Sequence, residues 1–156
     1  MNRFTNFRIS IILMTLALAG LTALTALAHT RPFHLVEHGT LMPDPDQPGR
    51  FIAEGTGTAT HLGSITVHRT LTLKPSEDGS GLVDVKGEAT LVAANGDELK
   101  TGIEGTLNPE TNHAILIYGW EGGTGRFVNA TGTTTWQVDI NKDQTYDVVA
   151  DGVINY

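Results

Sequence analysis

The sequence contains no cysteine, so the protein has neither a disulfide framework nor a cysteine-ligated metal site. Basic residues are also scarce: ten lysines and arginines stand against 17 acidic residues, which gives a net charge of −7. Because proteins neutralise nucleic-acid phosphates with lysine and arginine, this balance argues against a nucleic-acid partner. The acidic residues are scattered along the chain and form no block, which is typical of a solubilising surface.

The first 28 residues have the pattern of a secretory signal peptide. Arg3 and Arg8 precede an uncharged, mainly apolar run that ends in Ala26-Leu27-Ala28, the small-x-small form that signal peptidase cleaves. An uncleaved anchor is the alternative, since the run approaches the ~20 residues that a membrane span needs. Cleavage after Ala28 would leave eight basic and 17 acidic residues, a net charge of −9. We therefore predict an extracytoplasmic protein, periplasmic or secreted, with no stable membrane insertion after cleavage.

Apolar residues alternate with polar ones after residue 50, and no helical periodicity is found. In residues 81–92, for example, Val83, Val85, Ala89 and Leu91 share one face of a strand. The hairpin signal Asn95-Gly96 then leads into a second alternating segment, and both turn residues are expected to have positive φ. Strands are expected at 33–40, 51–60, 65–74, 81–92, 98–107, near 115–121, at 126–140 and at 145–156.

About eight short strands without a disulfide predict an all-β domain that closes into a single eight-stranded antiparallel barrel, because closure removes exposed sheet edges. Residues 29–50 are assigned to an N-terminal strand and a proline-rich loop, and residues 51–156 to the barrel domain. We find no second domain in the sequence.

A glycine-rich stretch, residues 121–138, has three possible interpretations. A phosphate loop needs a helix after the glycines, and the residues that follow have strand composition. Asn129-Ala130-Thr131 matches the N-glycosylation pattern, which often occurs by chance. We favour a barrel corner, in which the first glycines turn one strand into the next and Ala130-Thr131-Gly132 bends the second strand. The glycines of this corner are Gly122, Gly123, Gly125 and Gly132.

The stretch Gly122-Gly123-Thr124-Gly125-Arg126-Phe127-x-x-Ala130-x-Gly132 resembles the glycine-rich strand pair of the allene oxide cyclase and dirigent families. A second segment, residues 55–63, resembles part of secreted bacterial proteins with the same kind of barrel. The resemblance covers roughly residues 51–156 and implies a calycin-like barrel with a central cavity. Related barrels often dimerise or trimerise, so a homo-oligomer is possible. No catalytic residue is carried over to this chain.

Arg69 interrupts an otherwise apolar face that contains Ile65, Val67, Leu71 and Leu73. Alternation therefore points its side chain into the barrel, where a charge needs a partner. Glu121 shares a face with Ile115 and Ile117, and we expect it to point inward and to pair with Arg69, either as a structural bridge or as part of a cavity lining. The candidate ligand-lining residues are His61, at a possible barrel rim, Arg69, Tyr118, Glu121 and Trp136.

Six histidines offer one metal hypothesis. Cleavage after Ala28 would make His29 the N-terminus, and an N-terminal histidine can bind copper with a second ring from His34 or His38. A free terminus that happens to begin with histidine is the favoured interpretation, and we expect no cofactor.

The leading functional prediction is a non-enzymatic exported barrel that binds a small apolar or amphipathic molecule or serves as a scaffold. Eight strands enclose just enough space for one small ligand. The alternative is an isomerase or cyclase that holds a reactive intermediate in the cavity, since such catalysis depends on positioning and exclusion of water. Copper binding at His29 is the second alternative.

Overall fold

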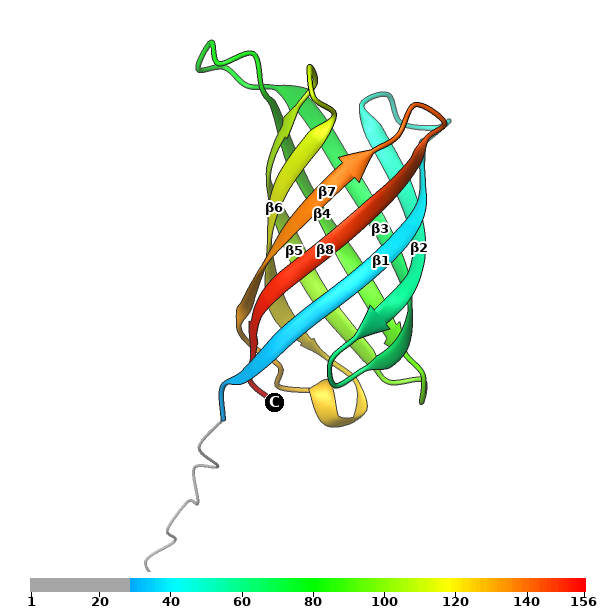
Figure 1. The fold of residues 1–156 in the computed structure, drawn as a ribbon, viewed down its shortest axis with the longest axis vertical. Helices are drawn as coiled ribbons and strands as arrows, with labels where there is room; N and C mark the ends of the chain where they lie inside the picture. The colour runs from blue at the N-terminus through cyan, green and yellow to red at the C-terminus, as the bar shows by residue number, and fades with distance from the viewer. Residues whose placement is uncertain (1–28) are drawn as a thin grey trace, which may run out of the picture.

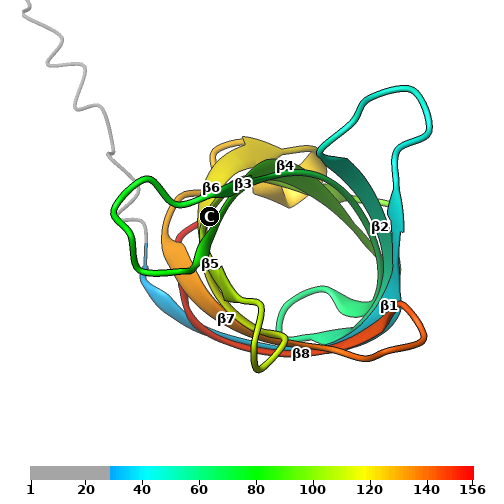
Figure 2. The same ribbon diagram turned by 90° about the horizontal axis from the view of Figure 1, so that it is seen from above.

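The computed structural model describes residues 29–156, and the predicted signal peptide lies outside the described residues. These residues form a closed antiparallel barrel in which each strand pairs with its sequence neighbours and the last pairs with the first (Figures 1 and 2). The strands are β1 (Arg31–Pro43), β2 (Arg50–Ala59), β3 (Gly63–Pro75), β4 (Val83–Ala93), β5 (Glu98–Asn108), β6 (His113–Gly123), β7 (Thr133–Ile140) and β8 (Thr145–Ile154). The all-β, eight-stranded prediction is confirmed.

The barrel begins earlier in the chain than residue 51. The strand predicted within residues 29–50 is β1, which pairs with both β2 and β8 and so closes the barrel. The proline-rich segment that follows it, residues 44–49, is the loop between β1 and β2. No helix within residues 29–156 is long and apolar enough to cross a membrane.

Two local predictions were wrong. The strand predicted at 126–140 begins at Thr133, because the preceding residues form a 3-10 turn, η1 (Gly125–Phe127), and a loop. In the β4–β5 hairpin Gly96 has a φ of 86°, whereas Asn95 does not have a positive φ. The Ala93 N–H donates to the Asp97 carbonyl, so the loop has three residues with glycine in the left-handed position.

The two ends of the barrel differ. At the upper end in Figure 1, where β1 and β3 end, loops of four to seven residues join the strands. At the lower end, near the C-terminus, the longer β6–β7 connection carries η1 and places Phe127, which is completely buried, against the ring of Tyr156. Large side chains fill the interior toward this lower end, among them Phe33, Leu35, Trp120 and Ile154. The lower end is therefore closed and packed.

Candidate ligand-binding site

The upper half of the barrel contains an apolar cavity. Its volume is about 40 Å³, and it opens to solvent at its upper end. Partly buried side chains near the upper strand ends form the mouth, and Arg69 and two tyrosines are the polar members of the lining. The lining residues are Leu41, Ala53, Arg69, Leu71, Leu73, Val85, Leu107, Ala114, Leu116, Tyr118, Val138, Ile140, Tyr146 and Val148.

A buried ion pair lies at the inner end of this cavity. Arg69 on β3 is 3% exposed and binds the Glu37 carboxylate of β1, which is 1% exposed, through both terminal nitrogens. The Nη1–Oε1 distance is 2.6 Å and the Nη2–Oε2 distance is 2.5 Å. Bidentate geometry of this kind is the strongest arrangement for an arginine and a carboxylate. The two charges compensate each other, so the buried pair is neutral as a unit.

Two tyrosines complete the hydrogen bonding of the pair. Arg69 Nε donates to the Tyr118 hydroxyl at 2.7 Å, and Arg69 Nη1 donates to the Tyr146 hydroxyl at 2.6 Å. Tyr146 then donates its own proton to Glu37 Oε1 at 2.7 Å. The Tyr118 hydroxyl, by contrast, accepts from Arg69 and donates no hydrogen bond to any residue in 29–156. Its proton therefore has no acceptor among these residues.

Trp136 lies beside this network. Its ring stacks on that of Tyr118 with a centroid distance of 3.9 Å and an interplanar angle of 8°. The Arg69 guanidinium carbon is 5.1 Å from the Trp136 ring centroid, within cation–π range. Trp136 Nε1 donates to the Thr134 hydroxyl at 2.6 Å, so its polar atom is also satisfied. Trp136 fixes the orientation of Tyr118 and is not itself part of the cavity lining.

Two glycines make room for the network. A Cβ atom at Gly55 would overlap the Glu37 carboxylate, and would lie 2.5 Å from the Tyr146 hydroxyl oxygen. A Cβ at Gly39 would meet the same hydroxyl at 2.5 Å. Contacts this short are not tolerated by real side chains, so glycine at these strand positions is a steric requirement of the buried pair.

The pKa shifts hold these groups in single protonation states. Burial disfavours the charge on Arg69, but Tyr118 and Glu37 outweigh that effect and raise the pKa of Arg69 above its ordinary value. Burial raises the pKa of Tyr118 to about 12, although Arg69 opposes the shift. Burial likewise raises the pKa of Tyr146 above its ordinary value. At neutral pH Arg69 is charged, and both tyrosines keep their protons.

The predicted inward orientation of Arg69 is confirmed, but its predicted partner was wrong. Glu121 is exposed on the outside of the barrel, where it borders two shallow hollows of the β3–β6 surface. The error arose from the face chosen for β6, since Ile115 and Ile117, which share Glu121's face, are about half exposed. The buried face of β6 carries Ala114, Leu116, Tyr118 and Trp120.

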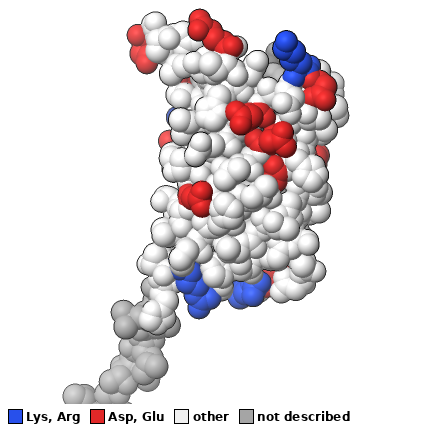
Figure 3. Space-filling view, viewed as in Figure 1, with Lys and Arg blue, Asp and Glu red and all other residues white. Residues whose placement is uncertain are grey.

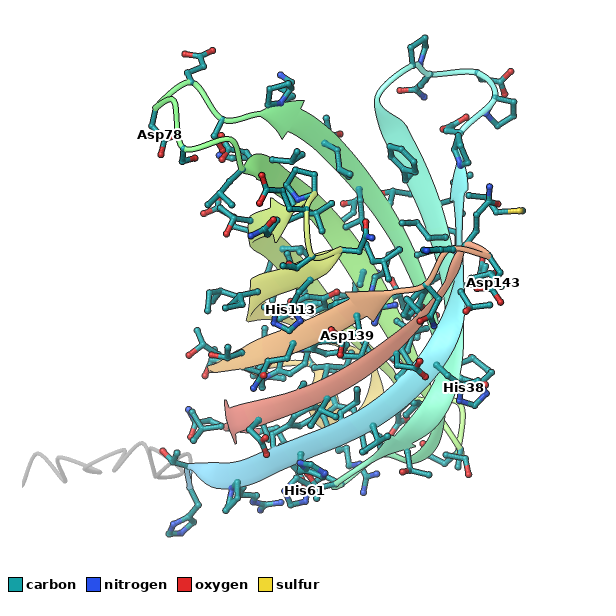
Figure 4. All side chains as sticks on the ribbon, turned by 45° about the horizontal axis from the view of Figure 1, so that its top comes forward. His38, His61, Asp78, His113, Asp139 and Asp143 are labelled. Carbon is teal, nitrogen blue, oxygen red and sulfur yellow. The ribbon has the colours of Figure 1, made fainter. Side chains whose placement is uncertain are left out.

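The predicted rim residue His61 lies at the closed lower end of the barrel, away from the cavity (Figure 4). It has a φ of 70°, its Nε2 lies 2.9 Å from the Pro32 carbonyl oxygen, and its ring contacts Tyr156 edge-on. Tyr118 lines the cavity as predicted, and Trp136 supports it. His61 therefore has a structural position in the lower end.

The glycine corner is part of this closure. Gly122, Gly125 and Gly132 have positive φ values of 87°, 53° and 123°, and Gly123 is the last residue of β6. Ala130-Thr131-Gly132 does not bend a strand, because β7 begins after it. Thr131 instead forms an isolated bridge with Asn155. The stretch is a nine-residue connection, residues 124–132, that covers the lower end.

The copper hypothesis stays a prediction. Among residues 29–156, no three His, Asp or Glu side chains are grouped closely enough to hold a metal ion. His34 and His38 both point outward from β1. His34 Nδ1 is engaged with Asp151 at 2.7 Å, and His38 lies near Thr56 (Figure 4).

Sequence reasoning missed Glu37 and Tyr146. The signal for Glu37 was available, because Phe33, Leu35 and Leu41 share its face of β1 and alternation places the carboxylate among them. Comparison with known proteins adds nothing to the site: no protein-family model matches the chain, and a search of curated proteins finds no similar sequence. The resemblance to the allene oxide cyclase and dirigent families stays a prediction.

Proposed function

We propose that the protein is an exported, non-enzymatic β-barrel that binds a small apolar or amphipathic molecule in its upper cavity. The observation that carries this proposal is the combination of an open apolar mouth with three polar side chains at the inner end. Ligand sites in proteins are mostly apolar, with a few polar groups that fix orientation. The closed lower end adds a floor, so a ligand has one way in and out.

The size of the cavity limits the ligand. The volume of about 40 Å³ has room for a few water molecules, so a larger ligand would extend from the cavity into the open mouth. Arg69 lies four residues below Leu73 on β3, roughly 13 Å along the strand. The ligand would therefore be a slender molecule whose inner end meets the tyrosines and whose outer end lies at the mouth.

The same cavity is the basis of the alternative, an isomerase or cyclase that confines a reactive intermediate. Acid–base catalysis works best when the pKa of the catalytic group lies near the operating pH. The pKa values of Arg69, Tyr118 and Tyr146 are all shifted away from neutrality, so these groups do not exchange protons readily at neutral pH. These shifts argue against acid–base catalysis by the three groups, so the alternative enzyme would have to act by positioning alone.

A fluorescence titration with the neutral apolar dye N-phenyl-1-naphthylamine tests the proposal. The wild-type barrel should give a saturable increase in emission. Val138→Trp, which fills the mouth, should weaken binding by about tenfold or more. The matched control Ile115→Trp places the same ring on the outer surface and should bind the dye as the wild type does. If Val138→Trp binds the dye with the same affinity as the wild type, the proposal is contradicted, and a scaffold that works through its outer surface is favoured.

A further inference from the structure

We infer that the cavity selects neutral molecules with a hydrogen-bond acceptor at one end, such as a ketone or an ester, over carboxylates and amines. The inference rests on the proposed function and names the class of ligand for that site. It follows from how the hydrogen-bonding capacity of the buried network is distributed between Glu37, Arg69 and the two tyrosines.

The first step concerns charge. Arg69 is already compensated by Glu37 in bidentate geometry, so the inner end of the cavity has no net charge to offer an anion. A carboxylate placed there would bring a second negative charge into an apolar, buried environment, where an uncompensated ion is costly. Other acidic and basic side chains lie on the outer surface of the barrel (Figure 3). An anionic ligand would therefore bind less tightly than its neutral analogue.

The second step concerns donors and acceptors. Glu37 Oε1 accepts bonds from Arg69 and Tyr146, Oε2 accepts from Arg69, and Glu37 is not part of the cavity lining. The Tyr146 hydroxyl both accepts and donates within the network. The Tyr118 oxygen already accepts from the charged Arg69, so the lining hydroxyls offer an ammonium group no anionic partner. An amine would lose its hydration without gaining a partner.

The third step identifies the group that recognises the ligand. Tyr118 lines the cavity, and its hydroxyl proton has no acceptor within residues 29–156. Arg69 uses four hydrogen bonds of the five that its N–H groups can donate. The unused donor positions at the inner end are therefore the Tyr118 hydroxyl proton and one N–H of Arg69. A neutral acceptor atom satisfies such a site, and an alkane leaves it unpaired.

The experiment is a competition series against the dye with four molecules of similar length: octane, 2-octanone, octanoate and octylamine. For the wild-type barrel we expect 2-octanone to bind most tightly, about tenfold better than octane, with octanoate and octylamine weaker than 2-octanone. In Tyr118→Phe the ratio of ketone to alkane affinity should fall to about one. Thr101→Val, which removes a buried hydrogen bond to the Gly102 carbonyl outside the cavity lining, controls for general loss of packing and should keep the ketone preference.

The carbonyl stretch of bound 2-octanone gives an independent readout. A hydrogen bond from Tyr118 should lower its frequency in the wild type relative to Tyr118→Phe. Equal affinity for ketone and alkane in the wild type, or tightest binding of octanoate, would overturn the inference while leaving the proposed function intact. If neither the dye nor any of the four molecules binds, the proposed function itself fails. Even if Tyr118→Phe does not fold, the affinities of the wild type for the four molecules distinguish failure of the inference from failure of the proposed function.

Discussion

Removing one member of the buried ion pair should destabilise the barrel more than removing both. In Arg69→Met the Glu37 carboxylate stays 1% exposed in an apolar interior with Tyr146 as its remaining donor. In Glu37→Met the guanidinium keeps two hydroxyl partners but loses its counter-charge. Breaking a buried pair in this way typically costs about 3–5 kcal/mol. For a domain of this size that corresponds to a fall in Tm of roughly 10–20 °C.

The double variant Arg69→Met/Glu37→Met restores neutrality with two unbranched apolar side chains of similar length. It leaves Tyr118 and Tyr146 without their network partners, at a cost of about 1–3 kcal/mol. The free energy of unfolding, from urea titrations of the four proteins at neutral pH, should therefore fall less for the double variant than for either single one. Strictly additive losses, or an unchanged Tm in Arg69→Met, would refute the view of Arg69 and Glu37 as a coupled buried pair.

The other predictions concern the glycines and the pH dependence of stability. Gly125→Val should lower the Tm, because φ is +53° and a Cβ would displace the Asp97 carboxylate. Gly79→Val, also at positive φ but with nothing within 4 Å, should cost less, and equal losses in a thermal melt would contradict the packing argument. Gly55→Ala should lower the Tm by many degrees because its methyl group meets the buried network, whereas Gly119→Ala, which meets nothing within 4 Å, should change the Tm little; equal effects would contradict the steric argument. Because the pKa of Tyr118 is raised to about 12 in the folded state from 10.0, its protonated form stabilises the barrel fully below pH 10, and this stability is lost as the pH rises toward 12. Urea titrations from pH 9 to 12 should show that loss in the wild type and a smaller pH dependence in Tyr118→Phe.

The alternation of apolar and polar residues predicts which side chains point inward on strands that have only one apolar face. On β3, Val67 and Leu71 flank Arg69 and fix its orientation, and on β5 Leu99 and Ile103 do the same for Thr101. These strands carry polar residues on the outer face, so the phase of the pattern is unambiguous.

On β6 both faces are apolar, so the pattern does not show which face points into the barrel. Ile115 and Ile117 point outward while Leu116 and Tyr118 point inward, so alternation alone favours neither assignment for Glu121. The partner of Arg69 was also beyond sequence reasoning. Which inward side chains meet across a barrel depends on the stagger between strands, which the sequence of a single strand does not encode. The closed lower end was missed in part because a glycine-rich stretch can equally continue a strand or form a 3-10 turn.

The measurement that tests the central claim most directly is a methyl NMR titration of residues 29–156 with octane. Binding in the upper cavity predicts saturable shifts of the Leu73, Leu107 and Leu116 methyl groups, which line it. The outward methyl groups of Ile115 and Ile117 should not move. Shifts confined to the outer surface, or no shift of the lining methyl groups up to the solubility limit of octane, would contradict the account of this barrel as a binding protein.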